Sequence, residues 1–264
     1  MNRWRRRLLR HAGHALLPLA VVWLVGIAGA IGGLWRPKPV LVALLVASFC
    51  GAAILALWSR WQRELAVREA SIPQFLKRKL RETYPHLTGK DCDLVERGLR
   101  QFFLACLRSN GRFVAMPSRA VDAMWHEFIL HTRGYRDWCD LVLGRFLHHT
   151  PAEVLGPKAE TNDGLRRAWY WACRDESIDP KKPSRLPLLF ALDAKLRVAN
   201  GFVYAADCRL ALQSAGTAGG NGSVHCGTSF SDGSFSGDAD SLGGVDSSDG
   251  SGDSGDGGGG CGGD

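Results

Sequence analysis

Two long apolar runs without a charged residue stand near the start of the chain, at residues 15–35 and 40–58. In a helix with a rise of about 1.5 Å per residue, each run reaches roughly 30 Å, the thickness of the hydrocarbon layer of a bilayer. Between them, Arg36-Pro37-Lys38-Pro39 places two prolines where one helix must end and the next begin. The pattern therefore predicts a membrane protein that begins with a transmembrane hairpin of two helices.

Basic residues are far more numerous at the two outer ends of this predicted hairpin than in the loop that connects its helices. Residues 1–14 hold five arginines and residues 59–83 hold seven lysines and arginines, whereas the connecting loop holds only Arg36 and Lys38. Because positive charge stays on the cytoplasmic side, we expect both termini in the cytoplasm and a multi-pass membrane protein. One alternative is open: Ala28-Gly29-Ala30 has the form of a signal-peptide cleavage site. In that case the second run would still span the membrane.

Apolar positions past residue 59 recur at helical spacing. Residues 59–83 are expected to form a basic juxtamembrane helix that continues from the membrane, and residues 84–210 a helical domain. Thr88 and Ser118 are candidate N-caps, and Pro187 fits the start of a short helix. No series of alternating strand positions is present, so the sequence predicts an all-α cytoplasmic domain.

Residues 211–264 are dominated by glycine, serine and aspartate. Eighteen of the 32 glycines lie from Gly216 onward, and such a segment buries too little apolar surface to offset its ordering entropy. We expect a disordered tail. It also carries eight aspartates and no lysine or arginine, so the net charge of +7 conceals a charge of +15 on residues 1–209. Membrane topology accounts for much of this charge, and no nucleic-acid-binding module is recognisable, so nucleic acid is not an expected partner.

Four of the eight histidines lie between residues 126 and 149. The run from His126 to His131 resembles a zinc-protease HExxH motif but is one residue too long. A spacing of five residues sets the two side chains about 140° apart around a helix, against about 40° in the motif. The eight cysteines are scattered without a CxxC pair, which excludes a zinc ribbon or a thioredoxin-type motif. The metalloprotease interpretation is therefore rejected.

A different grouping suits a metal ion better. Asp122 and His126 lie one helical turn apart, so the carboxylate can orient the imidazole. If the following helix runs to Thr150, Cys139 and His149 project toward the same packed side. His126, Cys139 and His149 are then candidate ligands of zinc or iron, with Asp122 supporting His126. The alternative is structural: Asp122 bonds His126, Cys139 fills the core and His149 belongs to a polar helix end.

Five residues in this region follow one another in a characteristic order: Asp122, Trp125, His126, Tyr135 and Cys139. Together with Met116-Pro117-Ser118, Leu147-His148-His149 and the stretch 204–208, this order resembles the glycine-rich domain-containing protein-like family over roughly residues 113–208. The resemblance implies a bacterial membrane-anchored member without an assigned reaction. Plant relatives in that family typically carry a second histidine two residues after the histidine of the Trp-His pair. Here that position is Phe128. A metal-binding role inferred from relatives with both histidines is therefore weakened for this chain.

No nucleotide-binding loop, nucleophile triad or CxxC pair is legible in the sequence. The leading hypothesis is a membrane-anchored, non-enzymatic interaction or scaffold protein that needs no cofactor and has the lipid bilayer and an unidentified protein as partners. The alternative is a metal-binding domain or enzyme that holds zinc or iron in the His/Cys cluster between two helices.

Overall fold

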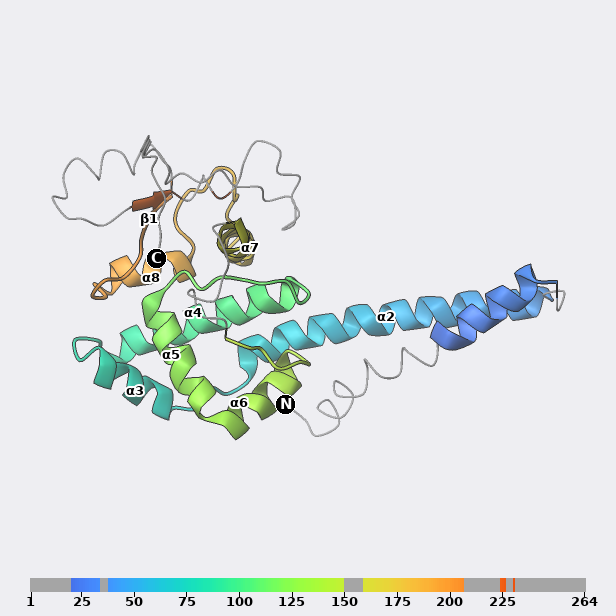
Figure 1. Cartoon of the computed structure of the whole chain (residues 1–264), viewed down its shortest axis with the longest axis horizontal. Helices are drawn as coiled ribbons and strands as arrows, with labels where there is room; N and C mark the ends of the chain where they lie inside the picture. Colours follow the sequence, from blue (N-terminus) through green and yellow to red (C-terminus); the bar gives the residue numbers. More distant parts are fainter. Residues whose placement is uncertain (1–19, 34–37, 150–158, 207–223, 227–229, 231–264) are drawn as a thin grey trace, which may run out of the picture.

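The computed structural model describes residues 20–33, 38–149, 159–206, 224–226 and 230 of the chain. These residues are mostly helical, and Figure 1 shows a globular body from which one long helix extends. That helix, α2, spans Pro39–Glu69 and begins with its proline in the first turn, where the missing N–H costs no hydrogen bond. Beside its far end lies a shorter apolar helix, Ala20–Ile31.

One helix in the described part of the chain, α2, is long and apolar enough to cross a membrane. Its outward positions are large and apolar, among them Val40, Leu44 and Leu57. The helix Ala20–Ile31 is too short to meet the same criterion, so the structure does not establish the two-helix transmembrane hairpin predicted from the sequence. Residues 15–19 and 34–37 of the predicted hairpin lie outside the described residues.

The last turns of α2 belong to the globular body. Ala66 and Val67 are buried there, and Glu64 accepts a 2.6 Å hydrogen bond from Arg108. The residues 59–83, expected to form one helix, are divided between α2 and α3, which spans Phe75–Thr83. Pro73 lies between them, and a proline restricts both itself and the residue before it, which favours a break.

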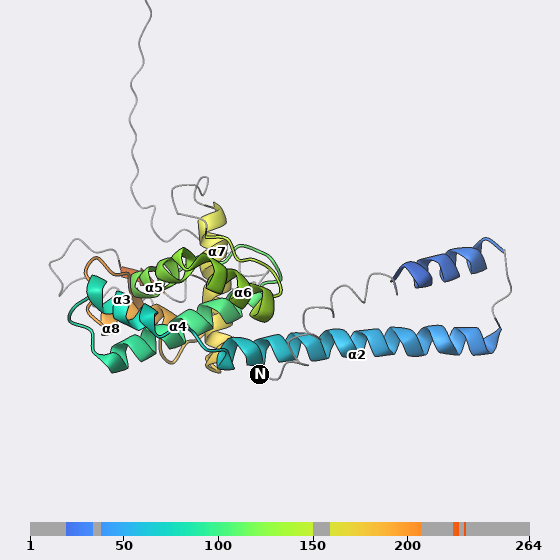
Figure 2. The ribbon, with the colours of Figure 1, turned by 90° about the horizontal axis from the view of Figure 1, so that it is seen from below.

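Helix α4, Gly89–Arg108, is the centre of the body and contacts α2, α3, α5, α7 and α8 (Figures 1 and 2). Thr88 caps it in a reciprocal capping box with Asp91, which confirms the predicted N-cap. Ser118 likewise caps α5, Arg119–Leu130. The remaining helices are α6, Thr132–Val142; α7, Ala159–Asp175; and α8, Leu188–Lys195.

Helix α6 is shorter than the periodicity suggested. It ends at Val142 rather than continuing to Thr150, and Gly144 follows with a φ of +74°. The backbone N–H groups of Leu143 and Gly144 both donate to the carbonyl of Cys139, an arrangement that closes a helix at a glycine. Residues 145–149 therefore return along the body as an irregular segment.

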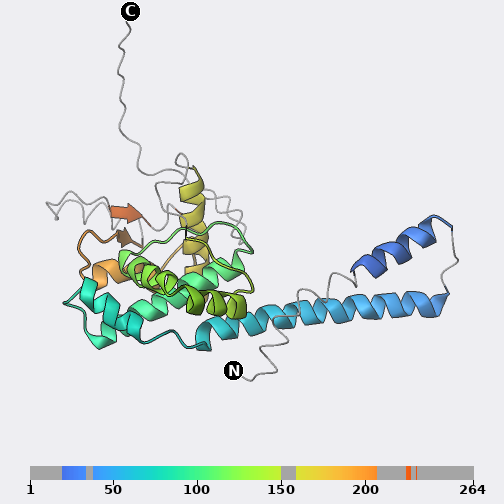
Figure 3. The ribbon, with the colours of Figure 1, turned by 60° about the horizontal axis from the view of Figure 1, so that its bottom comes forward.

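A small sheet replaces the purely helical fold expected at the end of the domain. Strands β1, Val203–Ala205, and β2, Val224–Cys226, pair in parallel (Figure 3). The second strand and the buried Phe230 belong to the segment predicted to be disordered, and Phe230 packs against Trp169 and Phe190. The prediction of disorder was thus too broad at its start, and residues 231–264 of the tail lie outside the described part of the chain.

Candidate functional site

Helix α5 and the segment after α6 bring three potential metal ligands together. Asp122 and His126 project from successive turns of α5, with Asp122 Oδ2 at 3.4 Å from His126 Nδ1. His149 approaches from the irregular segment, and its Nε2 lies 3.3 Å from Asp122 Oδ1. One ligand atom from each residue can be chosen so that all three lie within 4.8 Å of one another. The two imidazole rings have centroids 4.3 Å apart.

A hydrogen-bonded chain holds His149 in this position. Trp125 Nε1–H donates to the Tyr135 hydroxyl at 3.0 Å, and that hydroxyl donates to the Leu147 carbonyl at 2.7 Å. The indole of Trp125 also contacts the His149 ring, with centroids 4.8 Å apart. Because Trp125 and Tyr135 are buried, they fix the segment that carries His149 against α5.

Cys139, the third ligand expected from the sequence, lies elsewhere. It is fully buried beside the Tyr135 hydroxyl, and it is not part of the group of three found among the described residues. Burial raises the pKa of the Cys139 thiol, which opposes formation of the thiolate that binds a metal. Burial also raises the pKa of the Tyr135 phenol, so Tyr135 stays a neutral donor and acceptor in this chain of hydrogen bonds.

The group of three faces solvent on one side. The side chain of His126 is 50% exposed and that of Asp122 32% exposed, whereas His149 is 19% exposed. Ligand atoms around a tetrahedral zinc ion are about 3.3 Å apart, since each lies about 2 Å from the metal. Each imidazole lies near that distance from a different oxygen of Asp122, and the three ligand atoms taken one per residue lie within 4.8 Å of one another, so a metal would draw them slightly closer together. Two histidines and one carboxylate leave further coordination positions open to water or a substrate.

Sequence reasoning assigned Asp122 a supporting role, whereas its two oxygens face both imidazoles. It also did not single out Asp193, which is buried beneath the N-terminus of α5. Asp193 accepts hydrogen bonds from the Ser118 hydroxyl at 2.7 Å and the Arg119 N–H at 2.8 Å, so it fixes the start of the helix that bears the site. A lone acidic residue within the apolar run LLFALDAK was the available signal, because a buried charge needs partners.

A family model described as UCP032817-like matches residues 62–230, so the chain belongs to the UCP032817-like family. This match corrects the resemblance to the glycine-rich domain-containing protein-like family, which it does not support. The matched range starts in the last turns of α2 and ends at Phe230, and it contains the whole group of three. No curated protein and no solved structure matches this chain significantly.

Proposed function

We propose that this chain is a membrane-anchored protein whose helical domain binds a transition metal ion, zinc or ferrous iron, through Asp122, His126 and His149. The observation that carries the proposal is the convergence of these three side chains from α5 and the segment after α6. Imidazole and carboxylate together suit zinc and ferrous iron, and a set of three protein ligands is typical of sites with an exchangeable position.

Supporting side chains favour the same conclusion. The rigid placement of His149 by Trp125 and Tyr135 reduces the entropy lost when a metal is bound. Without a metal, the same geometry would serve as a structural pair of hydrogen bonds between Asp122 and the two histidines. A scaffold domain without a cofactor would use the three residues in this structural way. The metal content of the purified chain distinguishes such a scaffold from a metal-binding domain.

The anchor we propose is the two-helix hairpin, placed in the bacterial inner membrane with both termini in the cytoplasm. Its support comes from α2, the basic flanks and the contact between the two apolar helices. Trp23 Nε1–H donates a 2.7 Å hydrogen bond to Ser48 Oγ, and the Trp23 and Phe49 rings are 5.3 Å apart. A hydrogen bond between apolar helices helps them to associate in a bilayer, where polar groups lack other partners.

Metal content of the full chain, purified in detergent after exposure to zinc or ferrous iron, tests the proposed site. We expect about one ion per chain, lost in His126→Ala and in His149→Ala because each substitution removes a ligand. His148→Ala is the matched control, since His148 is exposed, adjacent to His149 and outside the group of three. Cys139→Ser should retain the metal.

Elemental analysis and a competition titration with a chromophoric chelator provide the readout. A well-folded, metal-free wild-type chain would sink the metal-binding proposal and favour the scaffold. Loss of metal in Cys139→Ser, with retention in Asp122→Asn, would instead assign the ion to the set of ligands expected from the sequence alone.

A further inference from the structure

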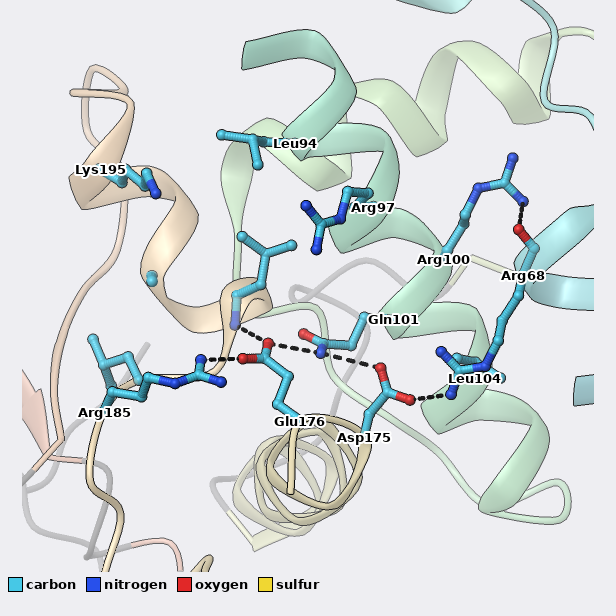
Figure 4. A pocket seen from close by; sticks show the side chains of 13 residues that line it. Arg68, Leu94, Arg97, Arg100, Gln101, Leu104, Asp175, Glu176, Arg185 and Lys195 are labelled. Atoms are coloured by element: carbon cyan, nitrogen blue, oxygen red, sulfur yellow. Dashed lines mark hydrogen bonds and ion pairs between the residues drawn. The ribbon is translucent and has the colours of Figure 1, made fainter. Parts of the chain in front are cut away.

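A groove with a volume of about 750 Å³ lies on another part of the body, between α4 and α8. The end of α7 and Arg68 in the last turn of α2 close its remaining sides (Figure 4). This volume is within the range of about 300–1,000 Å³ typical of small-molecule sites. Two carboxylates, Asp175 and Glu176, are outnumbered in its lining by five basic side chains: Arg68, Arg97, Arg100, Arg185 and Lys195.

Both carboxylates are already engaged at the bottom of the groove. Glu176 accepts hydrogen bonds from Arg185, from the Gln101 side chain at 3.0 Å and from the Leu188 N–H at 2.5 Å. Asp175 pairs with Arg68. These bonds join α2, α4, α7 and the start of α8, so the acidic residues form a fixed layer and do not neutralise the other cations.

Two of the remaining cations face each other across the groove. Figure 4 shows Arg97 reaching from α4 and Lys195 from α8 toward the space between these helices. Within the part of the chain that the structure describes, neither side chain makes a hydrogen bond or an ion pair, whereas Arg100 is held by Glu96 at 2.6 Å. The groove thus presents two unpaired positive charges on opposite walls, above a layer whose charges are balanced.

We infer that this groove binds a small soluble anion with more than one phosphate group, bridged by Arg97 and Lys195. A guanidinium group can bind phosphate oxygens through two parallel N–H bonds, and an ammonium group adds a mobile point charge. A phosphate group bound at one wall leaves the cation on the opposite wall without a partner. A pyrophosphate-like anion carries a second phosphate group for that wall.

Lipid headgroups carry the same phosphate chemistry, but the position of the groove favours a soluble source. Arg68 follows Trp58, the last residue of the predicted span, by ten residues. Along a continuous helix this is about 15 Å, beyond the headgroup layer of roughly 5–8 Å on each side of the hydrocarbon. This inference concerns a different site from the proposed metal centre and does not depend on it.

Calorimetric titration of the full chain with pyrophosphate, in nanodiscs of phosphatidylcholine, tests the inference. We expect saturable binding that weakens with added salt, and at least about tenfold weaker binding in the Arg97→Gln/Lys195→Gln double variant. Arg133→Gln/Arg136→Gln is the matched control, because it removes the same charge from exposed positions on α6 and should bind as the wild type does. Arg97 and Lys195 are exposed, so the melting temperature of the double variant should not change. If the melting temperature of the double variant falls, the test rests on the single variants Arg97→Gln and Lys195→Gln, and each must weaken pyrophosphate binding.

Three results would overturn the inference. The first is the absence of pyrophosphate binding by the wild type, and the second is equal weakening in both double variants, which would indicate a general charge effect. The third is loss of pyrophosphate binding in nanodiscs that contain phosphatidic acid, because a lipid headgroup would then be the occupant of the groove.

Discussion

Asp193 shows how one buried carboxylate can organise a helix distant from it in sequence. Only 2% of this residue is exposed, and its two oxygens accept four hydrogen bonds. The donors are the Ser118 hydroxyl and the N–H groups of Arg119, Ala120 and Phe202, at 2.7–3.2 Å. Three of the four belong to the start of α5, where backbone N–H groups lack partners within the helix. The carboxylate therefore connects α8 to the helix that carries the candidate site.

We predict that Asp193→Ala lowers the free energy of unfolding by about 3 kcal/mol, because several buried donors lose their acceptor at once. Chemical denaturation of the full chain, followed by circular dichroism, measures the change. Asp137→Ala is the matched control: Asp137 is exposed on α6, and its removal should change stability by less than about 0.5 kcal/mol. Equal stability of the two variants would contradict the role given to Asp193.

At the residue scale, sequence spacing predicts neighbours within a helix but not contacts across a turn. The pairing of Asp122 with His126 follows from one helical turn. The position of His149 depends on where α6 ends, and that end is determined by Gly144 and by the bond from Tyr135 to Leu147. The apolar periodicity, extended to Thr150, predicted a continuous helix where the chain instead turns after Val142.

Close packing between α4 and α8 depends on Gly98, which has no side chain to separate the helices. A Cβ atom there would lie 2.4 Å from Leu192 Cδ1 and 3.0 Å from Val121 Cγ2. Both neighbours are fully buried, so they have little room to move. We predict that Gly98→Ala destabilises the protein by about 1–2 kcal/mol, although alanine favours helices by about 1 kcal/mol over glycine.

Gly89→Ala in the same helix is the matched comparison for this prediction. A Cβ atom at Gly89 would meet no atom within 4 Å, so only the helix preference acts and stability should stay constant or rise. Guanidinium unfolding of both variants measures the difference. A Gly98→Ala protein as stable as the Gly89→Ala protein would contradict close contact between α4 and α8.

At the scale of elements, local signals were sufficient where a cap or a proline marks the boundary. The starts of α4, α5 and α8 follow Thr88, Ser118 and Pro187 as the sequence predicts. The parallel pairing of β1 with β2 was missed because each strand has three residues, too few for a periodic pattern, and they are far apart in sequence. Such pairing depends on tertiary contacts, here with Phe230 and Tyr204 in the core.

For the whole molecule, α2 is the element that joins the apolar N-terminal part to the body. It is continuous from Pro39 to Glu69, and Arg108 pairs with Glu64 near its end. The body would therefore be held at a set distance from a membrane crossed by α2, rather than on a loose tether. Arg60 and Arg63, the first basic residues after Trp58, then lie nearest the membrane surface, which is the charge distribution expected of a cytoplasmic flank.

The proposed topology predicts the behaviour of reporter fusions in a bacterial host. Alkaline phosphatase, active only outside the cytoplasm, should be inactive when fused after Ala70 or at Asp264 and active when fused at Lys38, since the basic flanks keep both ends inside. Green fluorescent protein should show the opposite pattern. An N-terminal epitope tag should remain on the full-length chain, whereas cleavage after Ala30 would remove it and leave α2 as a single span. Phosphatase activity after Ala70 would contradict the cytoplasmic placement under either outcome for the tag, because α2 would then have to cross the membrane in the opposite direction.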